Sequence, residues 1–155
     1  MTPLASTRRQ LLLASAGLGG WLLVRPAAAA TTDDPLEAAI HAWTGGASAA
    51  PARVKLDIAP LVDNGNTVPL VVAVDSPMSA SDHVVAIALF SQRNPQLDIA
   101  RFTLGPRVGR ARVSTRIRLA TTQKIAAVAR LSDGSYCRHT VDVIVTLAAC
   151  LEEAS

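Results

Sequence analysis

Apolar and polar residues alternate along most of the chain from residue 53 onward, in short runs that turn-forming residues separate. A period of two places the apolar side chains on one face of an extended strand. Glycine, proline, asparagine and aspartate mark the turns between the runs. Seven strands are predicted, at residues 54–58, 68–74, 84–90, 99–104, 111–119, 123–131 and 136–147. Since no helical pattern interrupts them, we expect an all-β fold over residues 53–147, an antiparallel β-sandwich.

A different period marks the segment before the strands. Leu36, Ile40 and Trp43 recur at the spacing that defines one face of a short helix. An aspartate cap, a proline in the first turn and a glycine pair at the end support this helix, at Asp33 or Asp34, Pro35, Gly45 and Gly46. Residues 31–52 are therefore expected to form a short N-terminal helix and a linker of small residues.

Two of the predicted strands divide clearly into faces. In residues 110–119 the apolar side chains share one face and arginines dominate the other, at Arg110, Arg112, Arg116 and Arg118. That arginine face is either a surface for a partner subunit or an oxyanion, or a solvated face that protects a sheet edge from pairing. In residues 136–147 Cys137 and His139 lie on the face with the valines, so both are expected to be buried in the core.

Residues 1–30 have the pattern of a removable export signal. Arg8 and Arg9 lie in a twin-arginine pattern, an apolar stretch follows at residues 11–24, and Ala27–Ala30 provides small residues for cleavage. The apolar stretch is short and contains three glycines, so we expect no stable membrane anchor, with an uncleaved anchor as the alternative. The pattern predicts export by the twin-arginine pathway and a periplasmic location.

The net charge changes once this signal is set aside. The chain has a formal net charge of +3, but residues 1–30 contribute three arginines and no acid, which leaves twelve bases and twelve acids. A neutral exported protein is not expected to bind nucleic acid. The remaining charges are unevenly distributed, because residues 101–138 contain nine bases and one acid. This polarity can steer an acidic partner or a small oxyanion toward the protein.

Several motifs, in order along nearly the whole chain, resemble those of SoxY, the periplasmic sulfur carrier family of thiosulfate oxidation. They are LVDNGNTVP at residues 61–69, VDSPM at 74–78, STRIRLA at 114–120 and LSDGS at 131–135. The resemblance implies an immunoglobulin-like antiparallel β-sandwich. It also implies a heterodimer with a second sandwich, SoxZ, which such a protein takes with it through the twin-arginine route.

In SoxY a C-terminal arm of sequence G-G-C-G-G holds sulfur covalently on its cysteine and presents it to periplasmic sulfur-oxidation enzymes. Cys150 matches that cysteine, and residues 148–155 would be the arm. The flanking glycines are replaced, and the arm resembles a SoxY-related subgroup with the arm A-A-C-I-E. The replacing residues are Ala148, Ala149, Leu151 and Glu152. They restrict the bends that glycine permits, and the carboxylates disfavour the thiolate and repel anionic thiosulfate.

We therefore expect a carrier that binds a sulfur-containing group on Cys150, as a heterodimer with a SoxZ-like subunit. The alternative is a non-carrier module that docks to or regulates a periplasmic redox enzyme, with Cys150 as an inert or dimer-forming thiol. Enzymatic activity, a metal site and a cofactor are not expected, because the sequence offers no nucleophile–base pair and no metal-ligand spacing. A disulfide from Cys150 to Cys137 is not expected either, since about 40 Å of extended chain separates them.

Overall fold

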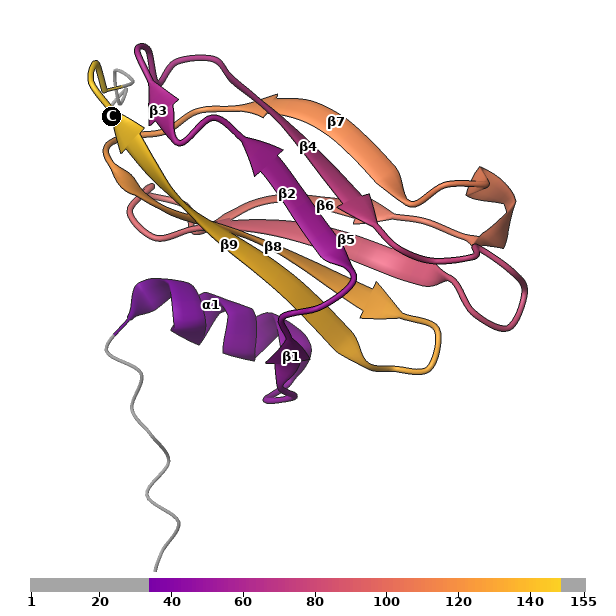
Figure 1. Ribbon diagram of the computed structural model, residues 1–155. Coiled ribbons are helices and arrows are strands. Elements are labelled where there is room, and N and C mark those ends of the chain that lie inside the picture. Colours follow the sequence, from indigo (N-terminus) through magenta and orange to yellow (C-terminus); the bar gives the residue numbers. More distant parts are fainter. Residues whose placement is uncertain (1–33, 149–155) are drawn as a thin grey trace, which may run out of the picture. The chain divides into compact units, whose positions relative to one another are not determined.

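The computed structural model describes residues 34–148. These residues form one helix, nine strands and a short 3-10 helix: α1 (Pro35–Thr44), β1 (Ala49–Ala50), β2 (Val54–Ile58), β3 (Leu61–Val62), β4 (Val68–Val74), β5 (Val84–Ser91), β6 (Asp98–Thr103), η1 (Pro106–Val108), β7 (Arg112–Ile117), β8 (Gln123–Leu131) and β9 (Tyr136–Val145). The strands form two facing sheets (Figure 1). One has the order β1-β9-β8-β5-β6, with β3 also paired to β9, and the other has the order β2-β4-β7. The predicted all-β, immunoglobulin-like sandwich is confirmed.

All seven predicted strands are present, and their ends lie within two residues of the expected bounds. The seven predicted strands pair with one another in antiparallel fashion, and the structure adds two short strands, β1 and β3, that pair in parallel with β9. Each of these two-residue strands lies beside one end of β9, with Ala49 opposite Tyr136 and Leu61 opposite Ile144. They cover backbone groups that β9 would otherwise leave unpaired along this edge.

The main core lies between the two sheets. Its largest side chains come from alternate positions of the facing strands, for example Leu70 and Val72 on β4, Leu89 on β5 and Ile125 on β8, all at most 2% exposed. Full burial of one such side chain contributes about 1.5–3 kcal/mol to folding. This core makes the two sheets one rigid support for the segments at their ends.

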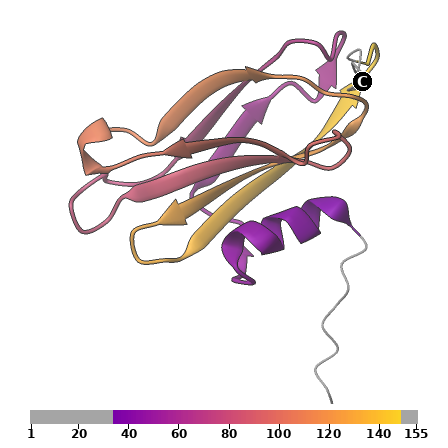
Figure 2. The ribbon, with the colours of Figure 1, turned by 180° about the vertical axis from the view of Figure 1, so that it is seen from behind.

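The helix adds a third layer on the outer face of the larger sheet (Figure 2). Leu36 and Ile40 of α1 pack against Phe90 of β5 and Val128 of β8. This second burial explains why β5 and β8 are apolar at consecutive positions, since strands covered on both faces lose the alternation. The sequence predicted the helix, but not its place on the sheet.

The ends of α1 follow the predicted signals. The Asp34 carboxylate accepts a hydrogen bond from the Leu36 amide at 3.0 Å, so Asp34 is the N-cap. Gly45 ends the helix in the left-handed region, with φ of 65°. Further contacts fix the helix to the sheet: Glu37 pairs with Arg138 at 2.7 Å, and Trp43 makes edge contacts with aromatic rings of β5 and β9.

The face predicted for β7 is confirmed, whereas the face predicted for β9 fails at His139. Cys137 is buried at 6% exposure, as expected. His139 is exposed, and its Nδ1 accepts a hydrogen bond from the Leu56 amide of β2 at 3.0 Å. The reason is that β2 and β9 meet here at the side of the sandwich, so this inward-facing position opens to solvent rather than to the core.

Candidate functional site

The candidate site is the root of the C-terminal arm, where β9 ends. Ala148 is the last described residue and is exposed. The predicted carrier Cys150 and its neighbours Ala149, Leu151 and Glu152 lie outside the described residues, as does the predicted signal at residues 1–30. The structure shows how the chain is held in place as far as the residue at which the arm begins.

Several hydrogen bonds hold the last residues before the arm. The Val145 amide donates to Thr122 Oγ1 at 3.0 Å. The Thr146 amide donates to the Val62 carbonyl at 3.0 Å, and the Thr146 hydroxyl donates to the Asp63 carbonyl at 3.1 Å. The Gly65 amide donates to the Leu147 carbonyl at 2.8 Å. The chain is therefore fixed through Leu147, and Cys150 follows three residues later, within about 10 Å of extended chain.

Exposed apolar side chains surround this root. Leu61, Ile144 and Leu147 are 56%, 55% and 61% exposed. Leu61 and Ile144 are neighbours across the parallel pairing of β3 and β9. Large exposed apolar side chains gathered at one place are typical of an interaction surface.

Asn94 joins the same end of the molecule to the chain that follows β7. Its side chain donates to the Arg118 carbonyl at 2.8 Å and accepts from the Ala120 amide at 3.0 Å. The amide of Leu119, the residue that follows Arg118, donates to the Gly65 carbonyl at 2.8 Å. Gly65 in turn bonds Leu147, so Arg118 lies close to the arm root through two consecutive backbone hydrogen bonds. Sequence reasoning treated Asn94 only as a turn residue and missed this role.

A hollow of about 210 Å³ lies beside the root, on the outer face of the larger sheet. Arg93, Lys124 and Asp142 bring charge to its lining, and Ile144 brings an apolar side chain. Two cations against one carboxylate give the hollow a net positive character. Within residues 34–148 no three His, Cys, Asp or Glu side chains gather closely enough to hold a metal ion.

The predicted arginine face lies on β7. Arg112 stands opposite Ala73 of β4 and Arg116 opposite Pro69, and Arg110 and Arg118 flank the strand. All four arginines are exposed, and none has an ion-pair partner among the described residues. The structure therefore places Arg112 and Arg116 on one outward face of the smaller sheet, with Arg110 and Arg118 exposed just beyond the ends of β7.

Cys137 and His139 lie away from the arm root, toward the start of β9. Cys137 is a free thiol opposite Ala129 of β8, eight residues before Val145 or about 26 Å along the strand. His139 is about 20 Å before Val145 by the same rise. Neither side chain can assist a group at the arm root. Cys137 is thus the buried structural thiol that the sequence predicted.

One carboxylate has a clearly shifted pKa. The Ser135 hydroxyl and amide donate to Asp133 Oδ1 at 2.6 and 2.8 Å, and these bonds lower the pKa of Asp133 below its ordinary value. Asp133 lies in the turn from β8 to β9, at the opposite end of β9 from the arm root. The shift therefore belongs to a turn rather than to the candidate site.

Comparison with solved structures defines the class of the protein. The sulfur carrier protein SoxY from Chlorobium limicola f thiosulfatophilum matches with a TM-score of 0.61 and 27% identity, over 72% of this chain and 96% of that chain. A superoxide reductase (neelaredoxin) from Ignicoccus hospitalis matches with a TM-score of 0.56 and 16% identity, over 70% of this chain and 86% of that chain. The second likeness shows the fold alone. The class is an immunoglobulin-like sandwich of a type that both proteins share.

The family follows from the sequence. The family model of the sulfur oxidation protein SoxY matches residues 40–150. The chain therefore belongs to the SoxY family, as its motifs indicated. The matched stretch begins within α1 and ends at Cys150. A comparison with curated proteins finds no match.

Proposed function

We propose that this chain is a carrier in sulfur oxidation that binds a sulfur-containing group covalently on Cys150. The observation that carries the proposal is the match to the SoxY family model, which extends into the arm as far as that cysteine. The related protein of known structure is itself described as a sulfur carrier protein. In this role the chain is not an enzyme, and it presents its cargo to enzymes of periplasmic sulfur oxidation.

The fixed root supports this role. Hydrogen bonds hold Thr146 and Leu147 against the β3 segment, so the arm starts from a defined point on a rigid sandwich. The exposed apolar side chains beside it offer a surface on which a receiving enzyme can rest. The other thiol, Cys137, is buried and does not compete for cargo.

The partner and the location belong to the same proposal. The chain forms a heterodimer with a SoxZ-like subunit, and the signal at residues 1–30 directs it through the twin-arginine pathway to the periplasm. No helix among residues 34–148 is long and apolar enough to cross a membrane.

A second function is favoured by one feature of the arm. Ala148, Ala149, Leu151 and Glu152 stand where the carrier pattern has glycine, and they make the arm stiffer and more acidic. A module that docks to or regulates a periplasmic redox enzyme, without covalent cargo, needs neither glycine flexibility nor a reactive thiolate. The two functions differ in what Cys150 carries.

Intact-mass analysis of the protein purified from its host, grown with thiosulfate, tests the proposal. We expect adducts of one or more sulfur atoms or a sulfonate, abolished by Cys150→Ser and retained in the matched control Cys137→Ser. A bare Cys150 thiol under sulfur-oxidising growth, with the host's thiosulfate oxidation unchanged in Cys150→Ser, would contradict the carrier role and favour the docking module.

A further inference from the structure

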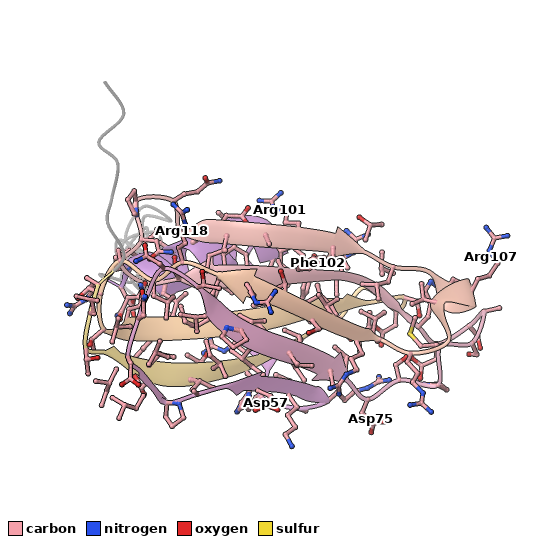
Figure 3. The ribbon with its side chains drawn as sticks, turned by 90° about the horizontal axis from the view of Figure 1, so that it is seen from above. Asp57, Asp75, Arg101, Phe102, Arg107 and Arg118 are labelled. Atoms are coloured by element: carbon pink, nitrogen blue, oxygen red, sulfur yellow. The ribbon has the colours of Figure 1, made fainter. Side chains whose placement is uncertain are left out.

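One side of the sandwich is left open. On the other side, β1 and β3 pair with β9, and β2 reaches β9 through the bond from Leu56 to His139. β6 and β7 are each the last strand of their sheet, and no described strand pairs with their outer edges. We call these two strands, the segment between them and the two residues after β7, residues 98–119 in all, the open edge. Figure 3 shows Arg101, Arg107 and Arg118 along this side and Asp57 and Asp75 on the opposite side.

The backbone of β7 is prepared for another strand. The Val74 amide donates to the Ala111 carbonyl at 2.8 Å, which marks these two residues as a hydrogen-bonded pair. Because such pairs alternate in an antiparallel ladder, the amide and carbonyl groups of Ser114 and Arg116 point away from β4. Unpaired groups of this kind are a template for strand addition.

The core is incompletely covered at this edge. Phe102 of β6 and Val113 of β7 pack against the buried core, yet both remain only half-buried. Apolar side chains from a partner would remove this remaining surface from water, which favours association in proportion to the area buried. The open edge thus combines free backbone groups with an apolar strip.

Charge selects the kind of partner. The open edge contains six arginines and one acid, Asp98, which is already paired with Arg101. Two copies of such an edge repel each other, so pairing with a second copy is disfavoured. Arg110 and Arg118 are about 26 Å apart along the chain, so the whole row is longer than one small oxyanion can span. An extended, acidic strand matches both the length and the charge.

We propose that the open edge is the docking surface for an acidic edge strand of the partner subunit, which adds to β7 and covers Phe102 and Val113. This inference rests on the proposed function, in which the partner is the SoxZ-like subunit. It also places the partner beside Arg118, two backbone hydrogen bonds from Leu147. The partner would then flank the root of the arm.

The test is titration calorimetry between this chain and the SoxZ-like subunit of the same host, each purified separately. We expect the double variant Arg112→Glu, Arg116→Glu to bind at least about tenfold more weakly, a loss of about 1.4 kcal/mol. The matched control is Lys55→Glu, Arg130→Glu, which makes the same charge change on β2 and β8 and should bind as the wild type does. Thermal unfolding of each variant alone confirms that it is folded.

Hydrogen exchange provides a second measurement. The amides of Ser114 and Arg116 should exchange slowly in the complex and rapidly in the free chain. If the wild type forms the complex but these amides stay unprotected and both double variants bind equally, the open edge is not the interface while the proposed function stands. If the wild type forms no complex, the open-edge proposal and the proposed heterodimer both fail, whereas the mass measurement on Cys150 decides the carrier role separately. Dimers of the chain alone that Arg112→Glu, Arg116→Glu abolishes would assign the edge to self-association and overturn the proposal.

Discussion

Asn94 connects two turns at the end of the sandwich where the arm root lies. Besides its bonds to Arg118 and Ala120, its Oδ1 accepts a hydrogen bond from the Gln123 side chain at 2.8 Å. Gln123 is 4% exposed and also accepts a bond from the Arg93 amide at 2.8 Å. A single amide side chain therefore joins the turn after β5 to the turn after β7.

Replacing Asn94 by alanine should lower the free energy of unfolding by about 1–3 kcal/mol, because three hydrogen-bonding groups lose their partner. Urea denaturation measures the change. Asn64→Ala is the matched control. Asn64 is exposed and bonds only Asn66, two residues away, so losing the Asn64 side chain should cost less. Equal losses for both variants would show that Asn94 does not join these turns.

The charge beside Cys150 should control the reactivity of the arm. Glu152 and its neighbouring carboxylates oppose formation of the thiolate, which is the species that reacts. With Cys137 replaced by serine, Glu152→Gln should alkylate faster than the parent near neutral pH, and added salt should reduce the difference. The variant Ala148→Gly, Ala149→Gly changes flexibility without charge and serves as the control. Identical rates for the parent and Glu152→Gln would exclude charge as the cause.

The lowered pKa of Asp133 gives a pH-dependent prediction. A depressed carboxyl pKa stabilises the fold at pH values above the pKa of the unfolded chain, and this contribution disappears as the pH falls through the folded pKa. In Ser135→Ala the pKa should rise toward its ordinary value, as measured by NMR titration. The stability difference between wild type and variant should accordingly be present at neutral pH and vanish in acid.

At the scale of elements, the helix and the seven main strands were predictable because each is a periodic run bounded by turn residues. β1 and β3 were not, because two residues carry no period and their pairing with β9 joins distant parts of the chain. His139 was misplaced for a related reason: alternation gives the face of a strand, but not whether the opposite sheet extends far enough to cover that face. The hydrogen-bonded root of the arm rests on contacts between distant turns, and no local pattern encodes them.

The helix should stabilise the sandwich without setting the chemistry of the arm. Trp43 packs its ring against Phe90 and Tyr136, with ring centroids 6.0 and 5.4 Å away. Trp43→Ala should therefore cost about 2 kcal/mol or more in thermal or urea unfolding. The alkylation rate of Cys150 in the folded variant should stay unchanged. A large change in that rate would mean that α1 and the arm root are coupled.

At the scale of the whole molecule, the basic open edge and the acids near β2 lie on opposite sides of one sandwich (Figure 3). Such a distribution orients an approaching partner before contact and makes its association rate sensitive to salt. The association rate of the SoxZ-like subunit with the wild type should therefore fall as ionic strength rises. The rate with Arg112→Glu, Arg116→Glu should be lower and less sensitive to salt. Stopped-flow measurements across a salt series provide the comparison.

The proposed export signal at residues 1–30 gives a prediction for the chain as a whole. The double variant Arg8→Lys, Arg9→Lys should leave the precursor in the cytoplasm, because the twin-arginine route depends on this pair. Cell fractionation and immunoblotting measure the distribution, and Arg25→Lys, outside the pair, is the control. Periplasmic accumulation of the double variant at the wild-type level would refute this route.

The bond from Gly65 to Leu147 acts as the fixed end of a tether. A thiol three residues beyond a fixed point is confined to a small volume, so an enzyme docked at the arm root encounters it at an effective concentration on the order of millimolar or higher. The docking contact can then be weak, because the tether supplies the local concentration that affinity would otherwise provide. In the proposed carrier role, weak docking would permit rapid release, so that one loaded carrier could visit successive enzymes without any of them retaining it.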